Sequence, residues 1–107
     1  MPTTYILILV TTSSKQEAEK ISQTLLKTKL IACANIIGPV SSHFQWNGKV
    51  EQTEEFLVLM KSRQDLFDAI SEQVKALHSY EVPEIVALPI MAGSKAYLEW
   101  LGTSLQS

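Results

Sequence analysis

The sequence has one cysteine, few charged residues and no long hydrophobic run. With Cys33 alone, no internal disulfide can form, which fits a reducing compartment such as the cytoplasm. The nine basic residues, set against eleven acidic ones, form no basic block, so the positive stripe needed for nucleic-acid binding is missing. The N-terminal apolar run from Tyr5 to Val10 is too short to span a bilayer, and no cationic segment precedes it. We therefore expect no membrane span, no signal peptide and no nucleic-acid partner.

Charged residues make up only 19% of the chain, whereas about 25% is usual for a globular domain. Much of the surface must then consist of uncharged polar residues or be buried against another molecule, and a second subunit is the simplest such partner. At 107 residues the chain is long enough for one domain with a real core and too short for two. The expectation is a single domain over residues 1–107 that forms an oligomer.

The first third of the chain predicts a strand followed by a helix. The run "YILILV" is continuous and apolar, which is typical of a central strand buried on both faces. Ser14 and Glu17 have the spacing of a capping box, in which each side chain satisfies a free amide at a helix start. Apolar residues at helical spacing then predict a helix from about Lys15 to Thr28.

Two long alternating segments flank Asn47-Gly48, a pair that favours the type I′ turn of a β-hairpin. The Gly38-Pro39 pair should bend the first arm. The arms are far longer than a mean strand of about 5–6 residues, so the hairpin should reach beyond the domain. Because it carries Phe44 and Trp46, we interpret it as an oligomerisation arm.

The remaining chain predicts a helix, an edge strand and a final helix. Ser62 is expected to cap the helix in "SRQDLFDAISEQVKAL", and "EIVALPI" is expected to be a strand with Pro89 at its end or on an edge. The last helix should be capped by Ser94 and bury Tyr97, among other side chains. The order β-α-β-β-α-β-α predicts an α+β, ferredoxin-like βαββαβ sandwich with an added C-terminal helix.

The segment "HSYEVPEI" after the second helix holds the clearest candidates for chemistry. An imidazole at His78 with carboxylates at Glu81 and Glu84 suits zinc, copper or nickel. The same residues fit a proline-stiffened connection with solvated charges, because a closed metal site usually needs three or four protein ligands. A site shared between subunits would need fewer ligands from each chain, so both interpretations stay open.

Other side chains also have more than one interpretation. Cys33 is expected to be a small buried hydrophobe, although a catalytic partner distant in sequence is possible. Lys61 could pair with Glu81, hold an anion or be solvated. His43 is interpreted as a solvent-facing strand residue that could also serve as a second imidazole ligand across an interface.

Several stretches together resemble the CutA divalent-cation-tolerance family. They are "VTTSSKQEAEKI", "LIACANI", "FQWNGKVEQTEEFLVLMK", "HSYEVPEIVALPI" and "YLEWL", and they cover the chain from Tyr5 to about Leu105. The resemblance implies a cytosolic homotrimer of ferredoxin-like subunits, similar to PII-type signalling proteins, linked to tolerance of copper and other divalent metals. It implies no enzymatic activity. It also implies an intersubunit pocket whose motif residues map onto Cys33, Trp46, Lys61, Tyr80 and Glu81, with His78 beside them.

The resemblance sets the functional expectation. We expect a trimeric, non-enzymatic protein that binds Cu(II) or another divalent cation weakly through His78 and folds without it. The family commonly has proline where this chain has Ser79, and some members have a second histidine where it has Leu77 and a cysteine where it has Val10. One alternative is a PII-like signalling or interaction scaffold whose intersubunit clefts bind a small anion through Lys61. Another is an enzyme that uses Cys33 or the Tyr80/Glu81 pair.

Overall fold

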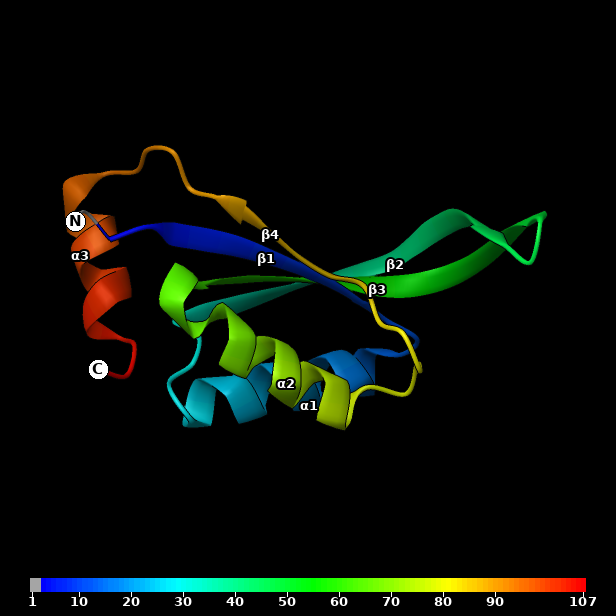
Figure 1. The fold of residues 1–107 in the computed structure, drawn as a ribbon, viewed down its shortest axis with the longest axis horizontal. Helices are drawn as coiled ribbons and strands as arrows, with labels where there is room; N and C mark the ends of the chain where they lie inside the picture. Colours follow the sequence, from blue (N-terminus) through cyan, green and yellow to red (C-terminus); the bar gives the residue numbers. More distant parts are fainter. Residues whose placement is uncertain (1–2) are drawn as a thin grey trace.

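The computed structural model describes residues 3–107 as one four-stranded antiparallel sheet with three α-helices (Figure 1). The elements are β1 (Tyr5–Thr12), α1 (Lys15–Lys27), β2 (Cys33–Trp46), β3 (Lys49–Arg63), α2 (Phe67–Leu77), β4 (Ile85–Pro89) and α3 (Lys95–Thr103). A short 3-10 turn, Gln64–Leu66, precedes α2. The strand order is β2-β3-β1-β4. The predicted α+β, ferredoxin-like arrangement with an added C-terminal helix is confirmed.

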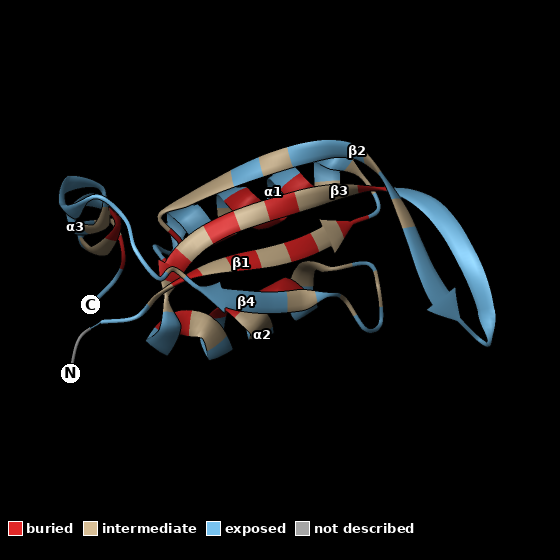
Figure 2. Cartoon of the chain, turned by 90° about the horizontal axis from the view of Figure 1, so that it is seen from above, coloured by how far each residue is buried: buried red, intermediate tan, exposed pale blue. Residues whose placement is uncertain are grey.

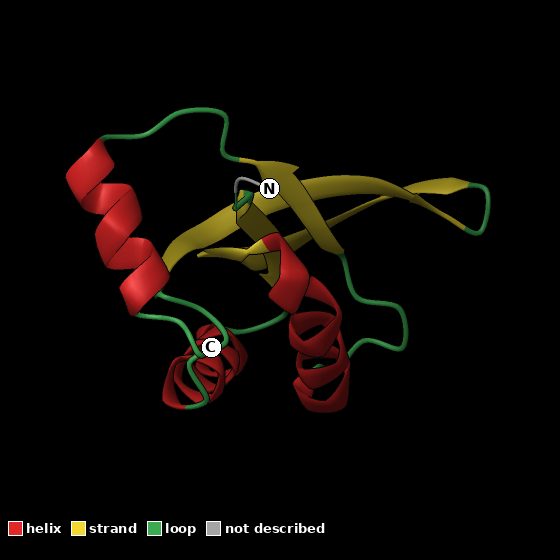
Figure 3. Ribbon diagram, turned by 60° about the vertical axis from the view of Figure 1, so that its left-hand side comes forward, coloured by secondary structure: helices red, strands yellow, loops and turns green. Residues whose placement is uncertain are grey.

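Helices α1 and α2 lie against the same face of the sheet and enclose the core (Figure 3). Ile8 of β1 and Met60 of β3 are fully buried beneath Ile21 of α1 and Ile70 of α2. Alternate residues of β1 are buried and half-buried, as the colour bands of Figure 2 show. The expectation that β1 is buried on both faces is therefore wrong for the single chain, because the helices cover only one face.

The long hairpin forms as the sequence predicts. Its arms, β2 and β3, have 14 and 15 residues. Asn47 and Gly48 both have positive φ, 51° and 75°, as a type I′ turn requires. The pairing register shifts between Ile37 and Val40, so Gly38-Pro39 does interrupt the first arm. The far half of the hairpin projects past the helices, where nearly all its residues are exposed (Figures 1 and 2).

Two of the three predicted helix caps are correct. The Ser14 side chain accepts a hydrogen bond from the Glu17 amide, and the Ser94 side chain accepts one from the Tyr97 amide. Ser62 does not cap α2, because β3 continues through it to Arg63 and pairs it with Ile6. Its buried hydroxyl instead donates to the Leu30 carbonyl. No side chain caps the start of α2, which follows the 3-10 turn directly.

Helix α3 sits at the end of the sheet opposite the hairpin (Figures 1 and 3). It buries Leu101, and Leu105 is buried just after it. Tyr97, which we expected on the buried side, is 39% exposed, and Trp100 beside it is also exposed. Helix α3 packs against the rest of the domain through only part of one face, so its aromatic side chains lie at the surface. None of the helices within residues 3–107 has the length and apolar character needed to cross a membrane.

Candidate functional site

The segment after α2 is held in place by hydrogen bonds at His78, Ser79 and Tyr80. The Ser79 amide donates to Glu17 Oε2 over 2.7 Å, which ties the segment to the start of α1. The Tyr80 amide donates to His78 Nδ1 over 3.0 Å, and the two rings lie 4.7 Å apart. The expected stiff connection into β4 is therefore present, fixed by hydrogen bonds as well as by Pro83.

Tyr80 also reaches the base of the hairpin. Its hydroxyl donates a 2.6 Å hydrogen bond to Glu55 Oε2, and only 7% of Glu55 is exposed. Burial raises the pKa of the Tyr80 phenol, and the hydrogen bond to the Glu55 carboxylate and its charge raise it further. The phenol therefore stays neutral and acts as a donor that satisfies a nearly buried carboxylate.

The geometry of His78 limits what it can do as a metal ligand. Its Nε2 lies 2.7 Å from the Thr11 carbonyl oxygen, which can only accept, so Nε2 carries the proton and Nδ1 accepts from Tyr80. A metal needs a free nitrogen lone pair, so binding would have to displace one of these bonds. Among residues 3–107, no three His, Cys, Asp or Glu side chains are grouped as a metal site would require. The donors of one chain do not by themselves fit a metal centre.

Cys33 and Lys61 meet at the other end of the sheet. They are register partners on β2 and β3, and Lys61 Nζ lies 3.8 Å from Cys33 Sγ. From α3, the Tyr97 hydroxyl lies 3.7 Å from the same sulfur, and the ammonium lies 5.5 Å from the centre of the Tyr97 ring. Cys33 is half-buried, so the expectation of a buried hydrophobe is wrong: a strand end and a surface helix enclose it only partly.

The five expected pocket residues thus fall in separate places on one chain. Cys33 and Lys61 are together, whereas Tyr80 contacts Glu55, six residues back along β3, or about 20 Å at about 3.3 Å per residue. Trp46 is 61% exposed at the hairpin tip. Glu81 is exposed, and no ion pair joins it to Lys61 in the part of the chain that the structure describes. Within the described residues of one chain, these five side chains do not form a common pocket.

The structure adds two residues that the sequence analysis did not select. Glu55 is buried against Tyr80, and Tyr97 packs beside Cys33 and Lys61. Glu55 lies in a stretch of the hairpin whose sequence is polar and typical of an exposed strand. Its partner, Tyr80, is 25 residues away, so no local sequence pattern predicts that Glu55 is buried. Tyr97 lies at helical spacing from residues of the core, and this spacing predicted that its side chain would be buried.

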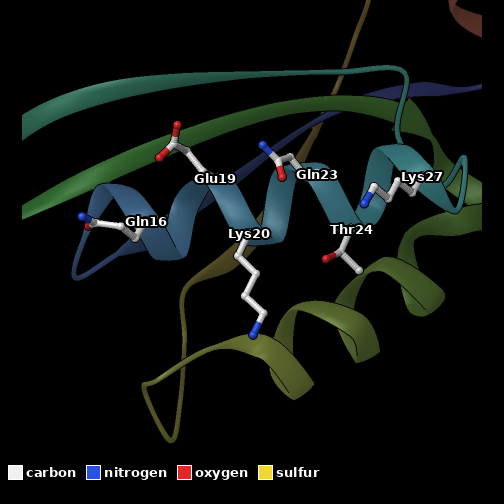
Figure 4. A pocket seen from close by; sticks show the side chains of 6 residues that line it. All are labelled: Gln16, Glu19, Lys20, Gln23, Thr24 and Lys27. Atoms are coloured by element: carbon white, nitrogen blue, oxygen red, sulfur yellow. The ribbon is translucent and has the colours of Figure 1, made fainter.

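A shallow depression on the outer surface of α1 contains none of the candidate residues (Figure 4). It is lined by Gln16, Glu19, Lys20, Gln23, Thr24 and Lys27. All of these come from one helix, so their side chains do not converge from different elements.

Comparison with known proteins identifies the family. The model of the family described as CutA1 divalent ion tolerance protein matches residues 6–104. The chain belongs to this family. The divalent-cation tolerance protein CutA of Thermus thermophilus is 44% identical over 94 residues, which are 88% of this chain and 91% of that protein. The chloroplastic protein CutA of Arabidopsis thaliana is 40% identical over 102 residues, 95% of this chain.

Solved CutA1 structures share the fold. The crystal structure of CutA1 from Oryza sativa has a TM-score of 0.94 and 40% identity, covering 97% of this chain and 95% of that one. The chain spans 56% of the length of the plant relatives from Arabidopsis and rice that it matches. The names of its relatives point to different compartments, since the Arabidopsis protein is called chloroplastic and a solved structure from Archaeoglobus fulgidus is called periplasmic.

Proposed function

We propose that this protein acts in divalent-cation tolerance as a homotrimer, without catalysing a reaction. The observation that carries the proposal is the family match over residues 6–104, together with relatives named for divalent-cation tolerance. The lone, unpaired Cys33 supports a cytoplasmic location for this chain. The proposal predicts that expression of the chain in a host lacking its own CutA protein raises the Cu²⁺ concentration at which growth stops.

The surface supports assembly of several chains. On the sheet face that the helices leave open, Leu7 and Leu9 pair with Leu88 and Val86, which are 53% and 47% exposed. Leu59 pairs with Leu9 on the other side, so these apolar side chains form one continuous strip. The projecting hairpin carries two further exposed aromatic side chains, Phe44 and Trp46.

Strand edges give a second reason for assembly. β2 and β4 lie at the two edges of the sheet, so each presents unpaired backbone groups that a neighbouring chain can pair with. The projecting arm of β2 and β3 can reach such an edge on another copy. Three copies related by a threefold axis would close the assembly, and they would bring Trp46 of one chain toward the pocket residues of another.

Metal binding is proposed to be weak and centred on His78. The imidazole must give up a hydrogen bond, to Thr11 or from Tyr80, before a nitrogen can bind an ion. A lost hydrogen bond costs about 1 kcal/mol, and one chain supplies few other donors nearby. Any remaining ligands would come from a neighbouring subunit, and the fold does not need the ion.

A specific observation favours a second candidate, an anion-binding scaffold. No carboxylate contacts Lys61 in residues 3–107, where the ion pair is Arg63–Asp65. An ammonium without a carboxylate at a proposed subunit boundary is suited to a small anion. Calorimetric titration separates the two candidates: Cu²⁺ should give saturable heat under the first, and phosphate or a dicarboxylate under the second, with Lys61→Gln abolishing only the anion signal.

A further inference from the structure

The turn at the tip of the projecting hairpin contains an asparagine followed by a glycine (Figure 1). Asn47 and Gly48 join β2 to β3, and both residues are exposed. Trp46 and Lys49 form the last register pair of the two strands, so the turn lies beyond the strand edges that another copy could pair with. A Cβ placed on Gly48 would have no atom within 4 Å. The turn is therefore uncrowded in the single chain.

The backbone nitrogen of Gly48 and the side-chain amide of Asn47 are both without hydrogen bonds within residues 3–107. The side-chain hydrogen bonds of the hairpin instead join Ser41 to His43 and to Gln52. Glycine has no Cβ, so its nitrogen can approach the preceding side chain with little steric hindrance. A nucleophilic nitrogen and an amide carbon thus lie on neighbouring residues, and no hydrogen bond in the described chain keeps them apart.

We propose that Asn47 is a site of spontaneous deamidation, in which the Gly48 nitrogen attacks the Asn47 side chain. Asparagine is one of the chemically labile residues of proteins, and here it lies in an exposed turn before the residue with the least hindered nitrogen. Water is the only other reactant, so the modification requires no binding pocket and no entry of a larger reagent. This inference goes beyond the proposed metal function and uses neither His78 nor a bound ion.

The reaction exchanges ammonia for water and involves no oxidant. The Gly48 nitrogen loses its proton and bonds to Cγ of Asn47, while the Cγ–Nδ2 bond breaks and the leaving amide takes up that proton to become ammonia. The product is a five-membered succinimide ring. Water then breaks one of the two bonds from the Gly48 nitrogen to the ring carbonyls. One break gives aspartate, and the other gives isoaspartate, in which the main chain runs through Cβ and Cγ.

Both products change the tip of the hairpin. Each places a carboxylate beside the exposed Trp46, where the unmodified chain has a neutral amide. Aspartate can still adopt positive φ. Isoaspartate adds a carbon to the backbone, so the two-residue turn between Trp46 and Lys49 can no longer have type I′ geometry. An aged chain therefore differs from a new one in both the charge and the turn of its projecting arm.

Incubation of the native protein for several days at mildly alkaline pH tests the proposal. Trypsin cleaves after Lys29 and Lys49, so a single peptide, residues 30–49, contains both asparagines of the chain, and its fragment masses assign the change to one of them. Asn47 should gain about one dalton and become a substrate for an isoaspartyl methyltransferase. Asn35 is the internal control: it is also exposed, but it lies within β2 and precedes the β-branched Ile36, so it should stay unmodified.

Asn47→Gly is the matched variant, because a Gly-Gly pair also favours the type I′ turn. Ion-exchange chromatography should show an acidic form that accumulates with time in the parent and is lost in Asn47→Gly. The parent unfolded in urea shows whether the assembled protein covers the turn. Conversion that occurs only in the unfolded chain, equal conversion at Asn35, or an acidic form that persists in Asn47→Gly would each overturn the proposal. None of these results bears on copper binding, so the metal function stands or fails independently.

Discussion

The Tyr80 hydroxyl donates a 2.6 Å hydrogen bond to the carboxylate of Glu55, joining the segment after α2 to the base of the hairpin. Glu55 is 7% exposed, so this carboxylate has little access to water. Burying a charge is costly unless a donor compensates it. The pair therefore fixes the position of "HSYEVPEI" relative to β3, and with it the position of His78.

Tyr80→Phe should lower the free energy of unfolding by about 1–3 kcal/mol, because it leaves a nearly buried carboxylate without this donor. Urea denaturation at a single protein concentration measures the loss. Tyr97→Phe is the matched control, since Tyr97 is 39% exposed and its hydroxyl lies beside the Cys33 sulfur rather than a nearly buried carboxylate. Equal losses in the two variants would contradict the role assigned to the Tyr80–Glu55 pair.

Glu17→Gln should destabilise the protein in a pH-dependent way. Burial alone would raise the pKa of Glu17, but hydrogen bonds from Ser79 and Ser13 and the nearby His78 lower it below its ordinary value of 4.5. A lowered pKa in the folded state means that the ionised group contributes stability above about pH 4.5, and that this stability is lost as the pH falls through the folded-state value.

The loss in Glu17→Gln should therefore be about 1 kcal/mol at neutral pH and should shrink at acidic pH. Urea titrations between neutral pH and the acid limit of stability measure it. Glu19→Gln, at an exposed position of the same helix, should show little effect at any pH. A pH-independent difference between the parent and Glu17→Gln would count against this assignment.

Local signals were enough to predict most of the fold. The hairpin follows from Asn47-Gly48, because few sequences favour positive φ at two successive positions, and α1 follows from Ser14 with its periodic apolar face. The cap predicted at Ser62 was wrong because a serine before a helix can either cap that helix or end the preceding strand. Pairing with Ile6, 56 residues earlier, keeps Ser62 in the strand, and no local sequence pattern contains that information.

The candidate site was less predictable than the fold because its contacts are non-local. The resemblance to the family placed Cys33, Lys61 and Tyr80 among the pocket residues, but only coordinates show that the first two meet and the third lies elsewhere. Tyr97 is exposed because α3 packs through a narrow contact, which helical periodicity does not reveal. The proposed intersubunit pocket would be completed by contacts between chains, and a single sequence does not describe that geometry.

Gly38→Ala should be costly because the Phe56 ring occupies the space where a Cβ would lie. The ring or the interrupted arm of β2 must then move, which typically costs about 1–3 kcal/mol. In the background of Phe56→Leu the penalty should shrink, since the smaller side chain leaves room. Thermal unfolding of the four proteins measures this coupling. Additive effects would show that Phe56 is not what excludes a side chain at position 38.

Assembly through the hairpin should make stability depend on protein concentration, because dissociation is coupled to unfolding. Light scattering should give the mass of a trimer at micromolar concentration, and the melting temperature should rise with concentration. Trp46→Lys at the hairpin tip should lower the mass and the melting temperature. Met91→Lys replaces an even more exposed apolar residue outside the hairpin, 97% against 61%, and should leave both unchanged. A monomeric mass for the parent would rule out this assembly.

Copper binding should depend on His78 more than on His43. His78 lies in the segment fixed by Glu17 and Glu55, whereas His43 is exposed on the hairpin with Ser41 as its neighbour. Calorimetric titration with Cu²⁺ should show weak, saturable binding that is lost in His78→Ala and kept in His43→Ala. Affinity should also fall as the solution is acidified, since a protonated imidazole has no lone pair for the ion.

Because His78→Ala removes the hydrogen bond to Thr11, the mass and melting temperature of this variant must be measured alongside, to separate loss of the ligand from loss of the fold. Binding that survives His78→Ala and disappears in His43→Ala would place the site on the hairpin, and binding unaffected by either change would remove histidine from the site altogether.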